Sequence, residues 1–177
     1  MSYIKHLRKA WLGKESQELM KERKIEWRRE PATIRVERPT KIDKAKSLGY
    51  KAKQGFLVVR ERLKRGGRMT EQVAGGRRSK RSGRNKVVGK SYQTIAEERV
   101  AKKFPNCEVL NSYYVTKDGV YIWYEVILLD RAHPRVMADK DVNWAFFEQG
   151  RVFRGKTSSG RKGRGLRTKG KGSEKVR

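Results

Sequence analysis

The spacing of hydrophobic residues predicts two helices at the start of the chain. The first helix ends at Gly13, and its hydrophobic residues recur every three or four positions: Tyr3, Ile4, Leu7 and Trp11. Ser16 is a favoured N-cap for the second helix, which Glu30 closes ahead of Pro31. The repeating positions of this second helix are Leu19, Met20, Arg23 and Trp27. Residues 1–30 are therefore expected to form a helical N-terminal extension.

Further along the chain, the pattern changes to one that is typical of strands. Residues 32–37 alternate between hydrophobic and polar side chains and are bounded by prolines, which predicts a half-buried strand. Residues 56–63 read as a second strand. Between the two, Thr40 can start a short lysine-rich helix, and Gly49 ends it.

The clearest helix begins after Ser91, which can cap it, and Pro105 follows its end. Its hydrophobic stripe consists of Tyr92, Ile95, Ala96, Val100 and Phe104. A last short helix is expected within residues 139–149, and it would carry Trp144, Phe146 and Phe147.

Residues 108–116 and 120–129 are rich in β-branched and aromatic residues, and the Asp118-Gly119 pair between them is typical of a tight hairpin. Five rings lie on this predicted hairpin: Tyr113, Tyr114, Tyr121, Trp123 and Tyr124. We interpret them as core and cross-strand packing. Stacking of nucleic-acid bases is the alternative, and it would require exposed rings.

This order of elements predicts an α+β fold. It indicates a small mixed or antiparallel sheet of about four strands in β-α-β-α-β-β order, packed by helices, with N-terminal helices and long basic extensions. The core is expected in residues 31–63 and 91–149. Residues 31–130 without their basic loop leave only about 70 residues of core. A core of this size buries barely enough hydrophobic surface to be stable, so we expect the stability of the fold to depend on a bound partner.

Two segments hold most of the positive charge of a chain whose net charge is +27. The basic loop, residues 64–90, has 10 Lys and Arg residues against Glu71, and the basic tail, residues 150–177, has 11 against Glu174. Both are rich in Gly, so ordering them costs much backbone entropy and we expect them to be disordered alone in water. Phosphate has the charge density to offset this cost, because each neutralised phosphate releases counterions. Nucleic acid is the predicted partner, and loose electrostatic attraction of a solvated tail is the alternative.

Several other classes of protein are disfavoured. No hydrophobic run approaches the roughly 18 residues of a membrane span, and neither a secretory signal, a lipidation motif nor a long basic amphipathic helix is evident. We therefore expect a soluble, cytosolic protein with no membrane partner. Cys107 cannot form an internal disulfide and has no neighbour at metal-ligand spacing, so we interpret it as a small residue at the start of a strand.

Residues 150–157 match the spacing of a phosphate-binding P-loop, and residues 126–130 resemble the acidic strand that accompanies one. A working P-loop leads into a helix, however, whereas residues 158–165 are a poor helix sequence. The acidic strand also precedes the loop and belongs to the predicted hairpin. We interpret the match as chance, and a nucleotide hydrolase is disfavoured.

No other constellation of side chains indicates catalysis. His6 and His133 are far apart in sequence, and a backbone hydrogen bond or an RNA contact is the expected role of His133. No nucleophile has a recognisable partner. We expect no enzymatic activity, no small-molecule substrate, no metal and no cofactor.

The most distinctive motif in the chain is DKAKSLGYKAKQG, at residues 43–55. Further distinctive stretches are residues 1–4 with Trp11, and residues 65–68, 123–128, 141–144 and 159–166. Together they resemble the archaeal and eukaryotic large-subunit ribosomal protein fifteen family, the "e" type. Lys46 stands where this family is expected to carry Arg, which preserves the charge but not the forked geometry.

This resemblance implies a structural protein of the large ribosomal subunit that binds and stabilises ribosomal RNA through its extensions and supports translation in the cytoplasm. Large-subunit ribosomal RNA and neighbouring ribosomal proteins are the implied partners. The RNA-binding residues are expected in the short helix and the turn after it, in the basic loop and in the basic tail. They are Lys44, Lys46, Lys51, Lys53, Gln54, Arg65, Arg68, Arg77, Arg78, Lys80, Arg81, Arg84, Arg154, Lys156, Arg161, Lys162, Arg164 and Arg167.

The competing hypothesis is a free nucleic-acid-binding protein, such as an RNA chaperone or a DNA-compacting factor, whose basic segments never settle into one site. Simple repeats or a DNA-reading element would favour it, and neither is evident in the sequence.

Overall fold

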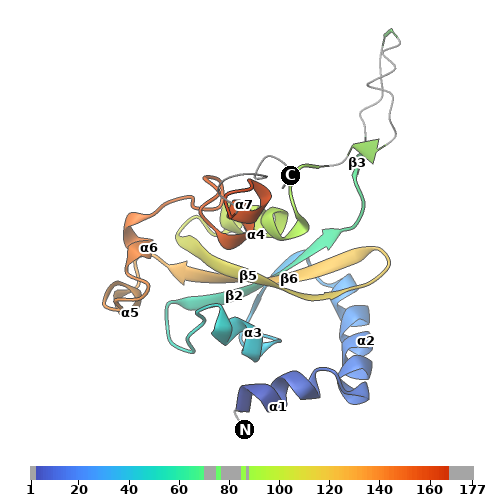
Figure 1. The fold of residues 1–177 in the computed structure, drawn as a ribbon, viewed down its shortest axis with the longest axis horizontal. Coiled ribbons are helices and arrows are strands. Elements are labelled where there is room, and N and C mark those ends of the chain that lie inside the picture. Colours follow the sequence, from blue (N-terminus) through green and yellow to red (C-terminus); the bar gives the residue numbers. More distant parts are fainter. Residues whose placement is uncertain (1–2, 70–74, 77–84, 87, 168–177) are drawn as a thin grey trace.

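The fold is built on a four-stranded antiparallel sheet. The computed structural model describes residues 3–69, 75–76, 85–86 and 88–167 (Figure 1). In spatial order the strands are β1 (Thr33–Val36), β2 (Phe56–Lys64), β6 (Tyr121–Asp130) and β5 (Cys107–Lys117). A second, two-residue ribbon pairs β3 (Arg68–Met69) with β4 (Asn85–Lys86), where the basic loop leaves and rejoins the described part. The predicted α+β class and strand number are confirmed.

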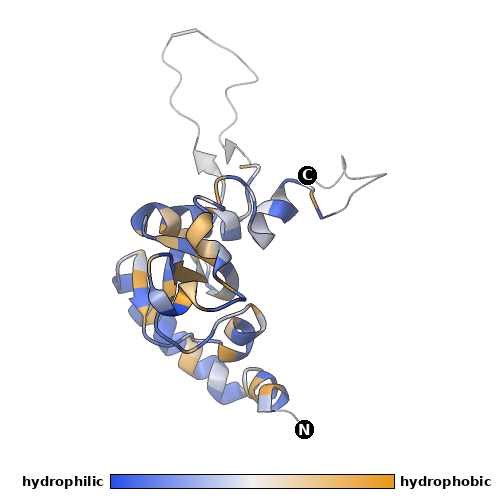
Figure 2. Ribbon diagram, turned by 90° about the vertical axis from the view of Figure 1, so that its left-hand side faces the viewer, coloured by the Kyte–Doolittle hydropathy of each residue, from blue (hydrophilic) through white to orange (hydrophobic). Residues whose placement is uncertain are grey.

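Helices cover both faces of this sheet. They are α1 (Tyr3–Ala10), α2 (Lys14–Arg29), α3 (Ile42–Ser47), α4 (Tyr92–Lys103), α5 (Pro134–Met137), α6 (Trp144–Phe147) and α7 (Ser158–Gly163). Figure 1 shows α4 and α7 on one side of the sheet and α1 to α3 on the other. Figure 2 shows hydrophobic and hydrophilic residues in alternation along several helices, and α4 turns Ala96 and Val100 into the core.

Strand β6 supplies both hydrophobic clusters of the core. Ile127 and Leu129 pack in the cluster that includes Trp27 of α2, whereas Val126 and Leu128 pack in the cluster that includes Val100 of α4. Successive side chains of a strand point to opposite faces, and here helices cover both faces. This double burial explains why the sequence of β6 is a continuous hydrophobic run and does not alternate.

The predicted hairpin joins β5 and β6, and its rings pack as interpreted from the sequence. Tyr113 and Trp123 are buried in the core. Tyr114 is half-exposed, and it pairs across the hairpin with Tyr124, with ring centroids 6.0 Å apart. Cys107 is the first residue of β5, and burial raises the pKa of its thiol to about 11, so it is a packing residue at a strand start, as predicted.

Three predicted details of the helices are wrong. Gly13, not Ser16, precedes α2, because the Ser16 hydroxyl donates back to the Ala10 carbonyl at 2.7 Å. Thr40 does not start α3, because its N–H donates to the buried Glu125 carboxylate at 3.0 Å. The short helix expected in residues 139–149 is confirmed as α6, but it is not the last helix, because α7 follows it; α5, before that segment, was not predicted. The His133 side chain caps α5 by accepting from the Arg135 N–H at 3.2 Å, which confirms the expected backbone hydrogen bond.

Glu125 is fully buried in β6 and ties the loop between β1 and α3 to the sheet. Its carboxylate accepts hydrogen bonds from the Thr40 N–H, the Thr40 hydroxyl and the Tyr113 hydroxyl. Burial raises the pKa of Tyr113, so this hydroxyl stays protonated and remains a donor. A buried carboxylate with three donors is satisfied, and removing it leaves all three donors without a partner.

Replacing Glu125 with Ala is expected to lower the free energy of unfolding by about 2 to 4 kcal/mol, since one buried donor and two partly buried donors lose their acceptor. Chemical denaturation of the full chain measures this loss. Glu22→Ala on the exposed face of α2 is the matched control and should change the free energy by no more than about 0.5 kcal/mol. Equal denaturation midpoints for the Glu125 variant and the wild type would contradict this account of the core.

Candidate nucleic-acid interface

The first part of the basic tail is folded against the core. The buried Glu108 carboxylate of β5 accepts hydrogen bonds from the backbone N–H groups of Gly150 and Arg151, at 2.8 and 3.1 Å. Val152 is buried in the cluster beneath α4. The expectation that the tail is disordered alone in water is therefore wrong for residues 150–167, and residues 168–177 lie outside the described part.

Small polar side chains hold α7 on α4 and β5. Thr157 caps α7 by accepting from the Gly160 N–H at 3.2 Å, and its hydroxyl donates to Glu97 of α4 at 2.7 Å. Ser159 and Thr94 join their hydroxyl groups at 2.5 Å. Glu97 is fully buried and also accepts from the Ser112 hydroxyl of β5. Residues 158–163 form α7 although their sequence is a poor helix former, because these long-range partners compensate for it.

Two glycines let the tail pack this tightly. Gly155 has φ of 69°, and the Arg164 side chain lies directly over the position that a Cβ would take. Gly160 is buried against Gly155: a Cβ on Gly160 would lie 2.8 Å from the Gly155 Cα. The backbone of α7 therefore approaches the preceding turn more closely than any other residue type would allow.

The P-loop spacing of residues 150–157 does not form a phosphate cradle. A short helix does follow it, but Lys156 pairs with Glu148 at 2.6 Å and the Thr157 hydroxyl is bound to Glu97. The segment follows α6 and not a strand of the sheet, and residues 126–130 belong to an antiparallel strand. The interpretation of this match as chance agrees with the geometry, since no strand leads into the segment and the buried Glu97 holds the Thr157 hydroxyl.

Two adjoining basic hollows lie between α6, α7 and β5, and together we call them the tail hollow. They are lined by Leu110, Asn111, Trp144, Glu148, Arg151, Arg154, Gly155, Lys156, Ser158, Arg161, Leu166 and Arg167. Five of these side chains are cationic and one is anionic. Such a concave surface attracts phosphate, because its walls focus the positive field.

The predicted tail residues differ in how freely they could contact RNA. Arg161 and Lys162 are exposed on α7, and their side chains make no hydrogen bond or ion pair within the described residues. The others hold the tail itself. Arg164 donates to the Phe153 carbonyl at 2.9 Å, and Arg167 donates to the Ser158 carbonyl at 3.1 Å.

Glu148 joins the remaining two predicted tail residues. It pairs with Lys156 and Arg154. Their hydrogen bonds hold the pKa of this carboxyl below its usual value, and the bond from Lys156 has the larger effect. The exposed pairs are weakly bound, so both cations remain able to turn toward a phosphate. Arg154 and Lys156 are therefore placed at the rim of the tail hollow and not locked within it.

Arg151 is a site residue that sequence reasoning missed. Its guanidinium lies 4.0 Å from the centroid of the Trp144 ring and donates to the Val109 carbonyl at 2.7 Å. It is half-buried in the wall of the tail hollow. In the sequence, Arg151 stands out only as the first cation of the basic tail, directly after Gly150. The sequence does not show that its guanidinium would stack on the ring of Trp144, seven residues earlier.

The residues predicted around α3 divide into two groups. Lys44 and Lys46 are exposed on α3, and Gln54 is exposed in the turn after it. Lys51 and Lys53 instead both bind the Asp139 carboxylate, and Lys51 also binds Asp141 at 2.7 Å. Hydrogen bonds from Lys53, then from Lys51, hold the pKa of Asp139 well below its usual range. These two ammonium groups tie the turn to the segment between α5 and α6.

The predicted loop residues lie mostly beyond the described part. Arg65 follows β2 and donates to the Asp118 carbonyl at 2.5 Å, which joins the start of the loop to the β5–β6 turn. Arg68 belongs to β3 by its backbone. Arg77, Arg78, Lys80, Arg81 and Arg84 lie outside the described residues.

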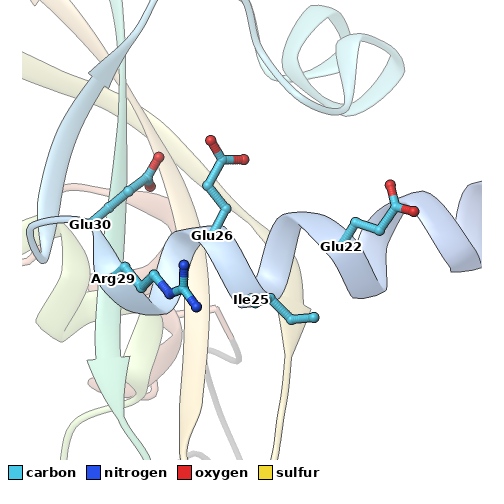
Figure 3. Close-up of a pocket in the computed structure, with 5 residues that line it drawn as sticks. All are labelled: Glu22, Ile25, Glu26, Arg29 and Glu30. Atoms are coloured by element: carbon cyan, nitrogen blue, oxygen red, sulfur yellow. The ribbon is translucent and has the colours of Figure 1, made fainter.

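An acidic hollow on α2 contrasts with the tail hollow. Glu22, Ile25, Glu26, Arg29 and Glu30 line it, and Figure 3 shows the carboxylates of Glu22 and Glu26 on the same side of the helix. Three carboxylates against one guanidinium repel phosphate. This part of α2 is therefore not a candidate for the nucleic-acid interface.

The described residues offer neither a membrane span nor a metal site. Within them, no helix has both the length and the hydrophobicity that crossing a bilayer requires. The same part of the chain brings no three His, Cys, Asp or Glu side chains together in a group that could hold a metal ion.

Comparisons with known proteins find related sequences over nearly the whole chain. The sequence model of the family described as Ribosomal L15, of the L15e type, matches residues 1–177. A protein of Methanocorpusculum labreanum named large ribosomal subunit protein eL15 is 55% identical over 160 residues, which cover 90% of this chain and 82% of that protein.

Proposed function

Because the chain belongs to the ribosomal L15e family, we propose that its basic segments bind and stabilise ribosomal RNA within the large ribosomal subunit. The protein is a non-enzymatic structural constituent of that subunit. Its membership implies ribosomal RNA and other ribosomal proteins as partners. The finer part of the proposal is which residues make the RNA contacts and how the fold presents them.

The observation that carries the proposal is the docking of the tail. Glu108 and Glu97 bind the start of the tail from inside the core, so that α7 presents Arg161 and Lys162 to solvent beside the tail hollow. A cation on a docked helix loses less conformational entropy on binding than one on a disordered chain. The fold therefore supports a defined site on RNA in place of loose attraction.

Arginine and lysine have distinct tasks in such a site. The guanidinium group of Arg offers paired donors to phosphate oxygens and a plane that stacks on unpaired bases, whereas the ammonium group of Lys acts as a point charge.

Figure 1 shows α3 and α7 on opposite sides of the sheet. Lys44 and Lys46 on α3 would thus contact RNA on one side of the core, and Arg161 and Lys162 on the other.

Replacing Arg161 and Lys162 together with Ala is expected to weaken binding of the full chain to isolated large-subunit ribosomal RNA. Each lost phosphate contact also lowers the steepness of the salt dependence, so the slope of log affinity against log salt should fall by about 2. Titrations at several salt concentrations measure both quantities.

Lys102 and Lys103 provide the matched control. They are exposed in the last turn of α4, and their replacement by Ala removes the same charge from a place outside the proposed interface. We expect this control to keep the salt slope within about 0.5 of the wild type. Equal slopes for the α7 variant and the wild type would contradict the proposed role of α7.

A further inference from the structure

Helix α6 carries two adjacent phenylalanine rings toward solvent. Phe147 is 81% exposed and Phe146 is 44% exposed. Phe147 has the highest exposed fraction of any large hydrophobic side chain in the described residues. Leaving a phenylalanine ring in water forgoes the free energy of burying it, so a ring this exposed marks a surface that something else covers.

The two rings contact each other. Their centroids are 5.1 Å apart and their planes meet at 87°, which is the edge-to-face arrangement that aromatic pairs prefer. This contact restricts the rotation of Phe147 before any partner arrives. A flat ligand therefore meets a ring that is already oriented, which lowers the entropic cost of binding.

The charges around the pair are positive and favour a polyanion. Arg131 donates to the Phe146 carbonyl at 3.4 Å. Glu148 directly follows Phe147, but Arg154 and Lys156 neutralise it. Burying these charged groups beneath an apolar protein surface would be costly, whereas a nucleic acid would satisfy them with phosphates.

We propose that Phe147, supported by Phe146, is a stacking surface for an unpaired base of ribosomal RNA. Exposed aromatic rings flanked by cations are the arrangement that binds single-stranded nucleic acid, because every base has a face that can stack. The inference rests on the proposed function and adds a second kind of contact to the phosphate contacts of α7. The sequence directed attention to the hairpin rings as stacking candidates, whereas the structure assigns that role to α6.

The test compares two substitutions on two RNA probes. Phe147→Leu keeps a large hydrophobic side chain but removes the aromatic face, and Phe147→Tyr keeps the face. The probes are a single-stranded oligoadenylate and an RNA duplex of the same length, whose bases are already stacked and paired. Affinities of the full chain are measured for both probes at one salt concentration.

We expect Phe147→Leu to bind the single strand about 5- to 100-fold more weakly than the wild type and to bind the duplex equally well. The affinity of Phe147→Tyr should stay within about twofold of the wild type on both probes. Equal binding of the single strand by Phe147→Leu and the wild type would overturn the inference. Failure of the wild type to bind either probe would instead overturn the proposed function.

Ultraviolet crosslinking of intact large subunits gives a second, independent measurement. The expected result is a nucleotide adduct on Phe147 or Phe146. Adducts on the peptide that contains Arg161 without any on α6 would overturn the stacking inference and leave the proposed function standing. A crosslink from α6 to a neighbouring protein in place of RNA would overturn it as well.

Discussion

Replacing Gly160 with Ala is expected to release α7 from the core and to reduce incorporation of the chain into large subunits by at least about tenfold, which corresponds to about 1.4 kcal/mol. The added Cβ would lie 2.8 Å from the Gly155 Cα and 3.2 Å from the Thr157 hydroxyl oxygen. Gly155 belongs to the backbone of the preceding turn and cannot rotate aside. The helix and the turn that contains Gly155 must therefore move apart, which shifts α7 from its docked position.

Such a movement breaks the contacts that dock the tail. The Thr157 hydroxyl would leave Glu97, and the Ser159 hydroxyl would leave Thr94. Burial already raises the pKa of the Glu97 carboxyl, and its hydrogen bonds from Ser112 and Thr157 offset part of this effect. Losing the Thr157 hydrogen bond leaves a buried carboxyl oxygen without a donor, which costs about 1 to 3 kcal/mol.

Gly163→Ala in the same helix is the matched control, because a Cβ there meets no atom within 4 Å. This change should leave incorporation unaltered and stabilise α7 slightly, since Ala favours a helix over Gly. The measurement is the ratio of variant to wild-type chains in purified large subunits from cells that express both. Equal incorporation of the Gly160 variant and the wild type would show that tight docking of α7 is unnecessary.

Replacing Arg77, Arg78 and Arg81 together with Ser is expected to reduce incorporation by about a hundredfold. Each guanidinium group can form a charge-assisted contact with a phosphate, and losing most of three such contacts has an effect of this size. This prediction rests on the charge of the loop alone, because these residues lie outside the described part. The same competition between variant and wild-type chains in purified large subunits measures it.

A triple Lys variant separates charge from geometry. It keeps three cations and removes the paired donors of the guanidinium group, so we expect incorporation between that of the Ser variant and that of the wild type. If the Ser variant incorporates as well as the wild type, the loop has no structured role on RNA.

The elements that the sequence predicted correctly depend on local signals. The stripe of α4 places Ala96 and Val100 in the core, and Ser91 caps this helix by accepting from the Thr94 N–H at 3.2 Å. Asp118-Gly119 joins β5 to β6, as expected. In each case the deciding residues lie within a few positions of one another, so that periodicity and turn chemistry suffice.

The errors arise where a distant side chain decides the outcome. Thr157 and Glu97 are 60 residues apart, and composition alone made residues 150–167 resemble a disordered tail. Lys53 and Asp139 are 86 residues apart, and charge alone made Lys53 resemble a free RNA contact. Composition located the basic segments, but which cations are engaged within the protein follows only from the fold.

We infer that the chain is held in the large subunit by shape as well as by charge. The most direct test sediments a lysate through a sucrose gradient in magnesium and high salt, and locates the chain by mass spectrometry. Screening by salt weakens exposed charge contacts far more than docked, shape-matched ones. We predict that the chain stays with the large subunit at near one copy each. Its release to the top of the gradient, while other large-subunit proteins stay bound, would contradict the claim.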